Sequence, residues 1–210
     1  MTATQAVARS PVVVPIRSLG PGHRERIAAH LKALDEHDRY LRFGYPARDE
    51  QIDRYVQGID FERDDVFGIY NRRLELIAVA HLAYPEDPQM ASCAEFGVSV
   101  LRKARGRGFG ERLFERAVIH ARNEGVQMLF IHALSENSAM LHIARKGGAT
   151  FEHAGGEAEG FLRLPPATFD TRIAELIEEQ VAQTDYRVKQ QAKRFRDLLM
   201  GREVRDRDPG

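Results

Sequence analysis

The chain has 210 residues, of which 43% are hydrophobic and 30% are charged, a composition typical of a folded globular protein. Lys and Arg together number 31, as do Asp and Glu, and this zero net charge argues against nucleic-acid binding, which usually requires a basic excess. The single cysteine, Cys93, excludes an internal disulfide framework and is typical of a reducing compartment. No apolar run approaches the roughly 20 residues that cross a bilayer, and residues 1–10 lack the apolar core of an export signal. We therefore expect a cytoplasmic protein that binds neither nucleic acid nor membrane.

The residue pattern in the first third of the chain predicts one strand and two helices. Val12–Leu19 is rich in β-branched residues but contains a proline, which indicates an edge or bulged strand. Pro21-Gly22 opens a helical pattern of apolar residues, and the polar segment Asp35–Asp38 interrupts it. A second helix is predicted over Arg48–Gly58.

The next segments alternate between strands and helices. Three strands are predicted first, over Val66–Tyr70, Leu74–Tyr84 and Ala94–Leu101. A glycine-rich loop follows, Arg105–Gly110, and opens a helix that ends near Asn123. An apolar strand, a short helix and a hairpin come last, at Met128–Leu134, Ser135–Lys146, and Thr150–Ala154 with Gly160–Leu164. This order predicts an α/β fold with a mixed sheet.

Composition divides the chain into four parts. We predict a flexible tail over residues 1–10, one domain over 11–166, an amphipathic helix over 167–200 and a charged tail over 201–210. Apolar residues recur along the predicted C-terminal helix at roughly helical spacing, and such a stripe must pack somewhere. It packs either on its own domain or on a second chain, and we favour a homodimer.

The loop RGRGFG, between a strand and a helix, is the most informative motif. Gly106, Gly108 and Gly110 let the backbone turn sharply and approach a ligand closely. The following helix directs free N–H groups and its positive dipole end at the same place, and Arg105 and Arg107 add positive charge. The motif predicts a phosphate or pyrophosphate site. Its spacing matches neither the dinucleotide nor the P-loop pattern, and a glycine-rich turn without a ligand is the alternative.

At these residues the chain resembles the GNAT superfamily of N-acetyltransferases. The family's pyrophosphate loop reads R/Q-x-x-G-x-G/A after its fourth strand, and Arg105, Gly108 and Gly110 match it. The segment ENSAMLHIARKGGATF resembles the family's next motif, with Asn137 opening a helix and Gly148 beginning a strand. Both motifs are most similar to those of bacterial protein-lysine acetyltransferases. The resemblance implies a largely antiparallel central sheet flanked by helices, to which the C-terminal helix is added.

The resemblance also implies acetyl-CoA as the acyl donor and an amine, on a small molecule or a protein, as the acceptor. Backbone groups of Val98, Ser99 and Val100 would meet the pantetheine arm, as would Asn137, for which a simple helix N-cap is the alternative. The pyrophosphate would be wrapped by Arg105, Gly106, Arg107, Gly108, Phe109, Gly110 and Glu111.

One departure from the family concerns proton donation to the leaving thiolate. Many members have a tyrosine seven residues after the motif's asparagine, where this chain has Ala144. A tyrosine acid at that position is therefore excluded. This loss makes a second function conceivable, in which a catalytically degenerate domain binds acyl-CoA as a regulatory or interaction module.

An acceptor amine must lose its ammonium proton before it attacks a thioester. At pH 7 this costs about 4–5 kcal/mol for a lysine-like amine and about 1 kcal/mol for an α-amine, so a base is expected. Glu95 lies on the strand before the loop, on the same face as Gly97 and Ser99. His132 lies near the end of the next strand, and histidine accepts protons near neutral pH. The alternatives are an ion pair at the sheet end for Glu95 and a structural role for His132.

The sequence gives little information on the acceptor. Its groove would be built from residues 35–58 and 85–92, where arginines such as Arg42 are mixed with acidic residues and indicate no charge preference. The histidines show no metal-ligand spacing, so no metal site is predicted.

Overall fold

The computed structural model describes residues 14–205, with side chains through Lys193. The predicted tail over residues 1–10 lies outside the described residues. Within them the chain forms a seven-stranded sheet in the order β1-β2-β3-β4-β5-β7-β6, in which β4–β5 is parallel and every other pair is antiparallel. The predicted α/β class, with a mixed and largely antiparallel sheet, is confirmed.

The elements follow the predicted order closely. The strands are β1 (Arg17–Leu19), β2 (Asp65–Tyr70), β3 (Leu76–Ala83), β4 (Cys93–Val100), β5 (Met128–Leu134), β6 (Thr150–Ala154) and β7 (Glu157–Arg163). The helices are α1 (Arg24–Lys32), α2 (Glu36–Phe43), α3 (Asp49–Gln57), α4 (Phe109–Asn123), α5 (Ser138–Lys146) and α6 (Phe169–Arg205).

The prediction was wrong at Asp35–Asp38, which was expected to interrupt a helix. This segment begins a third N-terminal helix, α2, because the side chain of Asp35 accepts a hydrogen bond from the Asp38 amide at 2.8 Å and caps the helix. Gly44, at φ 78°, ends α2 in the left-handed conformation that glycine adopts without strain. Residues 12 and 13 of the predicted first strand lie outside the described residues, and of residues 14–19 only Arg17–Leu19 pair with β2.

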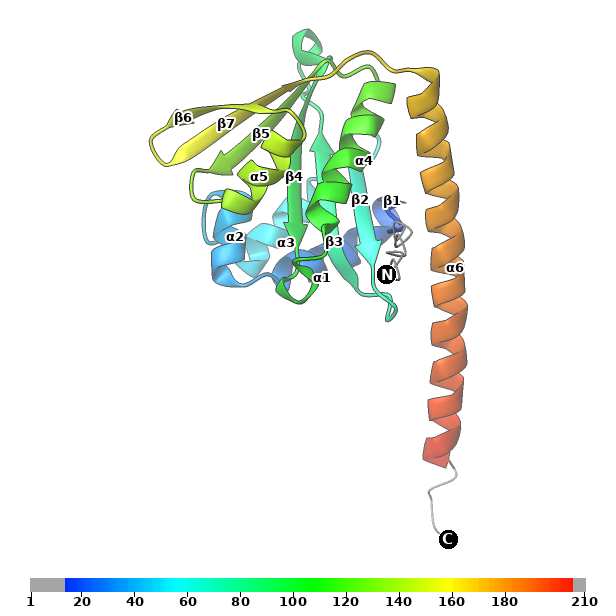
Figure 1. Cartoon of the computed structure of the whole chain (residues 1–210). Helices are drawn as coiled ribbons and strands as arrows, with labels where there is room; N and C mark the ends of the chain where they lie inside the picture. Colours follow the sequence, from blue (N-terminus) through cyan, green and yellow to red (C-terminus); the bar gives the residue numbers. More distant parts are fainter. Residues whose placement is uncertain (1–13, 206–210) are drawn as a thin grey trace, which may run out of the picture.

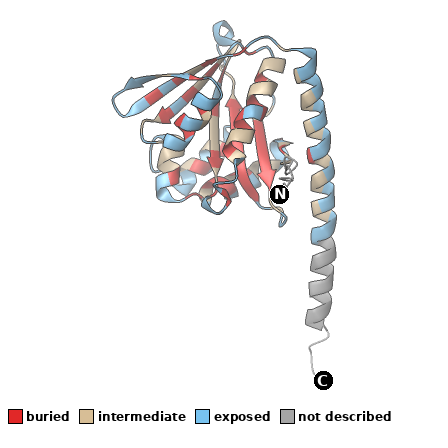
Figure 2. Cartoon of the chain, in the orientation of Figure 1, coloured by how far each residue is buried: buried red, intermediate tan, exposed pale blue. Residues whose placement is uncertain are grey.

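Helices cover both faces of the sheet (Figure 1). Alternate residues of β4 point to opposite faces, so Phe96 packs edge-on against Phe114 of α4, while the side chain of Ser99 meets His30 of α1. The buried residues concentrate in the strands and in the helix faces turned toward them (Figure 2).

The parallel pair β4–β5 separates after three residue pairs. Cys93–Glu95 pair with Met128–Phe130, and beyond them β4 pairs only with β3 while β5 pairs only with β7. The two strands therefore diverge toward their C-terminal ends, and the backbone of β4 that faces β5 is left without a strand partner there. This opening positions the functional site.

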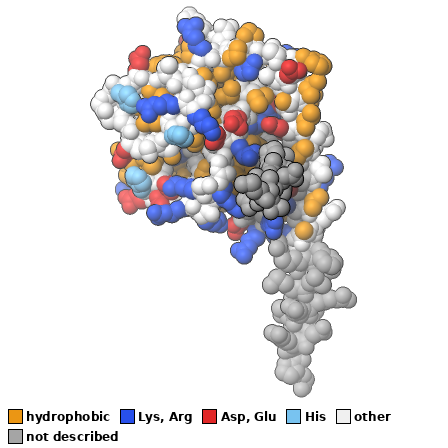
Figure 3. Space-filling model, in the orientation of Figure 1, with side chains coloured by type: hydrophobic (Ala, Val, Ile, Leu, Met, Phe, Trp, Pro, Cys, Tyr) orange, Lys and Arg blue, Asp and Glu red, His pale blue; other side chains and the backbone are white. Residues whose placement is uncertain are grey.

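Helix α6 lies beside the domain, and its C-terminal half extends past it (Figure 1). It ends at Arg205 rather than at the predicted Met200. Its inward face is polar: Arg116 of α4, only 3% exposed, is surrounded by Glu175, Glu178 and Glu179 at 2.6–3.7 Å. Its outward face carries exposed apolar side chains (Figure 3), namely Phe169, Ile173, Leu176, Ile177, Val181 and Val188. No helix in residues 14–205 has an apolar stretch long enough to span a membrane.

Candidate active site

Two adjoining cavities occupy the opening between β4 and β5. The first, about 500 Å³, is bounded by the end of α2, by β4, β5 and β7, and by the start of α5. The second, about 320 Å³, lies between α2, β4 and the glycine loop. Both are lined by Leu41, Arg42, Val98, Asn137 and Met140, so these residues form the junction between them.

The glycine loop forms one wall of the second cavity. Gly106 and Gly108 adopt φ 72° and 73°, and no atom lies within 4 Å of where a Cβ atom would stand on either residue. The loop therefore has open space over its backbone, and the first amides of the 15-residue helix α4 follow it directly. An anionic group can reach these amides without displacing any side chain, so the loop fits the pyrophosphate of coenzyme A.

The predicted cofactor residues, except Arg107, all line this second cavity. The side chain of Arg107 instead stacks over Phe109, with 5.5 Å between the guanidinium carbon and the ring centre. The guanidinium of Arg105 is held by Asp38 at 2.5 Å and donates to the Val100 carbonyl at 3.2 Å. Asp38 offsets the charge of Arg105, so the positive potential at the loop comes from the backbone amides, the helix end and the charge of Arg107 beside Phe109.

The hydroxyl of Ser99 is bonded into the core. His30 Nδ1 lies 2.9 Å from the Leu76 carbonyl and must donate to it, so Nε2 accepts from the Ser99 hydroxyl at 2.8 Å. Burial lowers the pKa of His30 to about 4, which keeps the ring neutral as this pattern requires. The Ser99 side chain is thus unavailable to a ligand in the second cavity.

Asn137 connects α2 with α5. Its side-chain oxygen accepts from the Met140 amide at 3.1 Å, which confirms the N-cap interpretation. Its amide nitrogen donates to the Leu41 carbonyl at 3.3 Å, across the opening. The helix cap therefore also fixes α2 against α5 at the junction of the two cavities.

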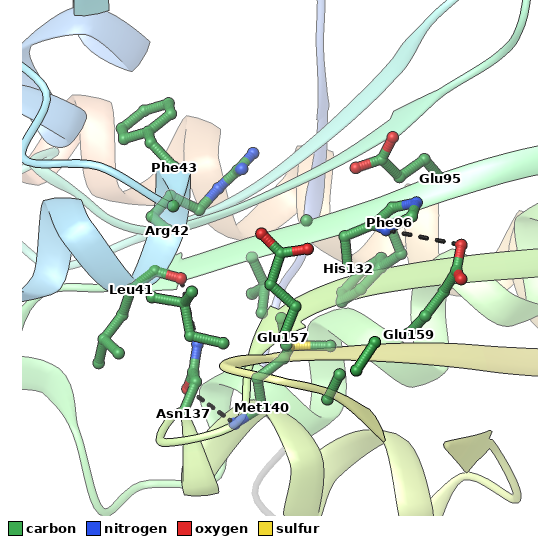
Figure 4. A pocket seen from close by; sticks show the side chains of 17 residues that line it. Leu41, Arg42, Phe43, Glu95, Phe96, His132, Asn137, Met140, Glu157 and Glu159 are labelled. Atoms are coloured by element: carbon green, nitrogen blue, oxygen red, sulfur yellow. Dashed lines mark hydrogen bonds and ion pairs between the residues drawn. The ribbon is translucent and has the colours of Figure 1, made fainter. Parts of the chain in front are cut away.

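The two predicted bases line the first cavity, on neighbouring strands (Figure 4). Glu95 forms no ion pair with any residue that the structure describes, and Gly97 on the same face of β4 also lines this cavity. His132 lies on β5 with Nδ1 3.9 Å from Glu159 of β7, and its side chain is 54% exposed. Both side chains are open to a ligand in the cavity.

Two charged lining residues, Glu157 and Glu159 of β7, were missed by the sequence analysis, and Arg42 of α2 was placed in the acceptor groove without a specific role. The two glutamates were missed because the strand was expected to begin at Gly160, whereas β7 begins at Glu157. Arg42 lies far along the chain from β4. The one signal for it was Gly97, a glycine within a strand, which often marks a close approach by another group.

The fold and the two cavities define a class of protein, the transferases that hold an acyl carrier in a splayed strand pair beside a glycine loop. The model of the GNAT acetyltransferase domain family matches residues 14–150 of this chain. The protein belongs to this family. It is an acyltransferase enzyme, and its acyl donor is acetyl-CoA.

Several solved structures share the fold. The GNAT domain of PAT from S. lividans is 21% identical with a TM-score of 0.62, over 73% of this chain and 95% of that one. A spermidine N-acetyltransferase from Vibrio cholerae, in complex with CoA and spermine, is 18% identical with a TM-score of 0.57, over 72% and 95%. A ribosomal-protein-alanine N-acetyltransferase from Brucella melitensis is 17% identical with a TM-score of 0.55, over 70% and 96%.

Proposed function

We propose that the protein transfers an acetyl group from acetyl-CoA to a primary amine by direct attack of the amine on the thioester. Bound acetyl-CoA supplies an acyl carbon activated by a thiol leaving group. The observation that carries the proposal is the junction of the two cavities. The glycine loop opens into one cavity and the two proton-accepting side chains, Glu95 and His132, line the other.

We assign the donor to the second cavity. The backbone of Gly106, Gly108 and Gly110 and the first amides of α4 would hold the pyrophosphate, with Arg107 contributing its charge from beside Phe109. The unpaired edge of β4 at Val98–Val100 offers hydrogen-bonding groups to the pantetheine arm, and Asn137 lies opposite it.

We assign proton acceptance to Glu95, with His132 as the second candidate. Glu95 lies on β4 and lacks an ion-pair partner among the described residues, so its carboxylate is free to accept a proton from an ammonium or a bridging water. His132 lies near Glu159, which could orient the imidazole if the two move closer than 3.9 Å. Either residue would lower the cost of deprotonating an alkyl amine.

Glu95→Gln tests this assignment. The variant is expected to keep its affinity for acetyl-CoA but to lose about 10²–10⁴-fold in kcat/KM, with a smaller loss at alkaline pH. A limb in the pH–rate profile that disappears only in His132→Gln would transfer the role to the histidine. Glu152→Gln, an exposed glutamate of β6 outside both cavities, is the matched control. Full turnover by both site variants across pH would show that the enzyme only positions an already neutral amine.

The acceptor is proposed to be a small molecule or a protein. The two motifs resemble most closely those of bacterial protein-lysine acetyltransferases, which keeps lysine side chains among the candidates. Proteins with the same fold include a spermidine N-acetyltransferase and a ribosomal-protein-alanine N-acetyltransferase, which represent both kinds of acceptor. The single Cys93 is the basis for a cytoplasmic location, which stays a prediction.

We also propose that α6 pairs with α6 of a second copy. Its outward apolar side chains, such as Leu176 at 66% and Ile177 at 58% exposed, cover no part of their own domain. Residues 169–185 carry five acidic and one basic side chains, whereas 186–205 carry seven basic and two acidic. Three of the acidic residues, Glu175, Glu178 and Glu179, already surround Arg116, so the charge contrast serves only to select the orientation: an antiparallel pair with two-fold symmetry keeps the two basic halves apart.

A further inference from the structure

We propose that the acceptor is an amino-acid-like molecule, whose carboxylate binds Arg42 while its amine faces Glu95. This inference rests on the proposed function and narrows its acceptor. It assigns Arg42 as the residue that determines acceptor specificity.

Arg42 is a charged group that projects from α2 into the junction of the two cavities (Figure 4). It forms no ion pair with any carboxylate in the part of the chain that the structure describes. Its one hydrogen bond there goes from Nη2 to the hydroxyl of Tyr55, at 2.9 Å. A guanidinium has five N–H donors, so most of its donors are available to a ligand.

The close approach of Arg42 to β4 depends on Gly97. A Cβ atom at this position would lie 2.6 Å from Nη2, 2.7 Å from Cζ and 3.0 Å from Nη1 of Arg42. The guanidinium therefore covers the backbone of β4 just before Val98, next to the predicted path of the pantetheine arm. A group bound to Arg42 would stand close to the reacting thioester.

A chain of buried polar groups holds Arg42 in this place. The Tyr55 hydroxyl lies 2.7 Å from His81 Nδ1, and His81 Nε2 lies 3.2 Å from Asp64. Burial and the charge of Arg42 lower the pKa of His81, so its ring is neutral. Because the Tyr55 hydroxyl accepts from Arg42, its own proton is donated to His81 Nδ1, and the neutral ring carries its proton on Nε2. The guanidinium is thereby oriented before a ligand arrives.

Carboxylates occupy the other walls of the first cavity. Figure 4 shows Glu95 and Glu157 directed toward the space beside Arg42, and Glu159 farther from Arg42, next to His132. The cavity is thus bipolar, with one unpaired cation on one wall and acidic groups facing it. An ammonium is attracted to the glutamates, and a carboxylate can accept two parallel hydrogen bonds from the guanidinium. A molecule that carries an ammonium and a carboxylate a few bonds apart can bind the glutamates and Arg42 at the same time.

An acceptor without an anionic group leaves Arg42 unpaired inside the complex. Burying an uncompensated charge is unfavourable, and Arg42 also repels a second cation placed next to it. A polyamine could use Glu157 and Glu159 but would gain nothing from Arg42. The bipolar cavity therefore favours an amino acid over a polyamine or a peptide lysine.

The test compares free amino acids with their carboxamides, which lack the anionic group. Because the amine of a carboxamide has the lower pKa, the comparison is made at an alkaline pH at which both amines are neutral. Acetyl-CoA is the donor, and the N-acetyl product is measured by mass spectrometry. The wild type is expected to prefer the best acid over its amide by about 10-fold or more in kcat/KM. Arg42→Gln is expected to bring this ratio to about one, and Arg42→Lys to an intermediate value.

Two further variants separate recognition from folding. Arg72→Gln removes an exposed arginine of the turn between β2 and β3, outside both cavities, and is expected to keep the wild-type ratio. Tyr55→Phe removes the hydrogen bond that orients Arg42 and should lower the ratio through a higher KM for the acid. A general loss of structure would instead reduce turnover of acid and amide alike.

Three results would overturn the inference. The wild type could acetylate spermidine or a lysine peptide and no amino acid, which leaves the proposed function intact. Arg42→Gln could reduce acid and amide equally with their ratio unchanged, which would place Arg42 on the acyl donor. A protein that binds no acetyl-CoA and acetylates no amine overturns both this inference and the proposed function.

Discussion

The glycine loop can be tested by adding one side chain to it. Gly108 adopts φ 73° with no atom within 4 Å of a Cβ position, so Gly108→Val meets no protein atom but is strained by about 1–2 kcal/mol. The two methyl groups would stand over the amides assigned to the pyrophosphate. Hydrogen bonds to a charged group contribute about 1.5–3 kcal/mol each, so loss of even one corresponds to about 10- to 150-fold weaker binding.

Gly125 supplies the matched control. It adopts φ 84° between α4 and β5, away from both cavities, and also has no atom within 4 Å of a Cβ position. Both valine variants should lose similar free energies of unfolding, and Tm should fall by about 2–4 °C for each kcal/mol. Only Gly108→Val should lose affinity for coenzyme A in isothermal titration calorimetry. Equal and undiminished affinity in two well-folded variants would refute the assignment of the loop to the cofactor.

Two further predictions concern α6. Burial alone would lower the pKa of His120, but its hydrogen bonds to Asp65 and Glu175 outweigh this and raise it to about 9. A raised histidine pKa stabilises the fold fully below pH 6.5, and this stabilisation is lost as pH rises from 6.5 through 9. The free energy of unfolding, measured by chemical denaturation, should therefore fall by up to about 3 kcal/mol over this range. His120→Gln should flatten this dependence, and an unchanged profile would contradict the role given to His120. For the α6 pairing, Leu176→Glu should convert a dimer to a monomer in sedimentation velocity, while Met90→Glu, on an exposed apolar residue outside α6, should not. A spin label at Arg172 should lie about 40 Å from its copy in the antiparallel pair; a monomeric wild type, or a short distance between these labels, would refute the pairing.

The part of the fold from β4 to β6 could be predicted from sequence because its signals are local. A glycine loop between an apolar strand and an amphipathic helix fixes β4 and α4, and a Gly-Gly pair fixes the hairpin of β6 and β7. Helix α2 was missed because its sequence is mostly polar and lacks a long apolar stripe. The capping pattern of Asp35 and Asp38 was the available signal for it.

The orientation of α6 could not be predicted from its own sequence. An apolar stripe is expected to face the domain, yet the polar face is turned inward. The reason lies in α4, where Arg116 is buried and requires carboxylates, which Glu175, Glu178 and Glu179 supply. The buried charge of Arg116 on α4 therefore determines which face of α6 turns toward the domain, although the apolar stripe of α6 favours the opposite face.

The candidate site also contains one part that could be predicted from the local sequence and one part that could not. The placement of Glu95 on one face with Gly97 follows from strand alternation, and the structure has both in one cavity. Arg42 reaches that cavity only because α2 crosses the end of β4, and its orientation depends on Tyr55, His81 and Asp64 from three other segments. Such long-range assembly leaves no periodic trace in the sequence.

The central claim, acetyl transfer to an amine, is tested most directly by following a labelled acetyl group. The protein is incubated with isotopically labelled acetyl-CoA and a panel of amines that includes amino acids, their carboxamides, spermidine and a lysine peptide. We predict that the label appears in an amide product in step with thiol release, and that Glu95→Gln slows both together. Thiol release that yields only labelled acetate, or tight binding of acetyl-CoA without release, would contradict the account and indicate a hydrolase or a binding module instead.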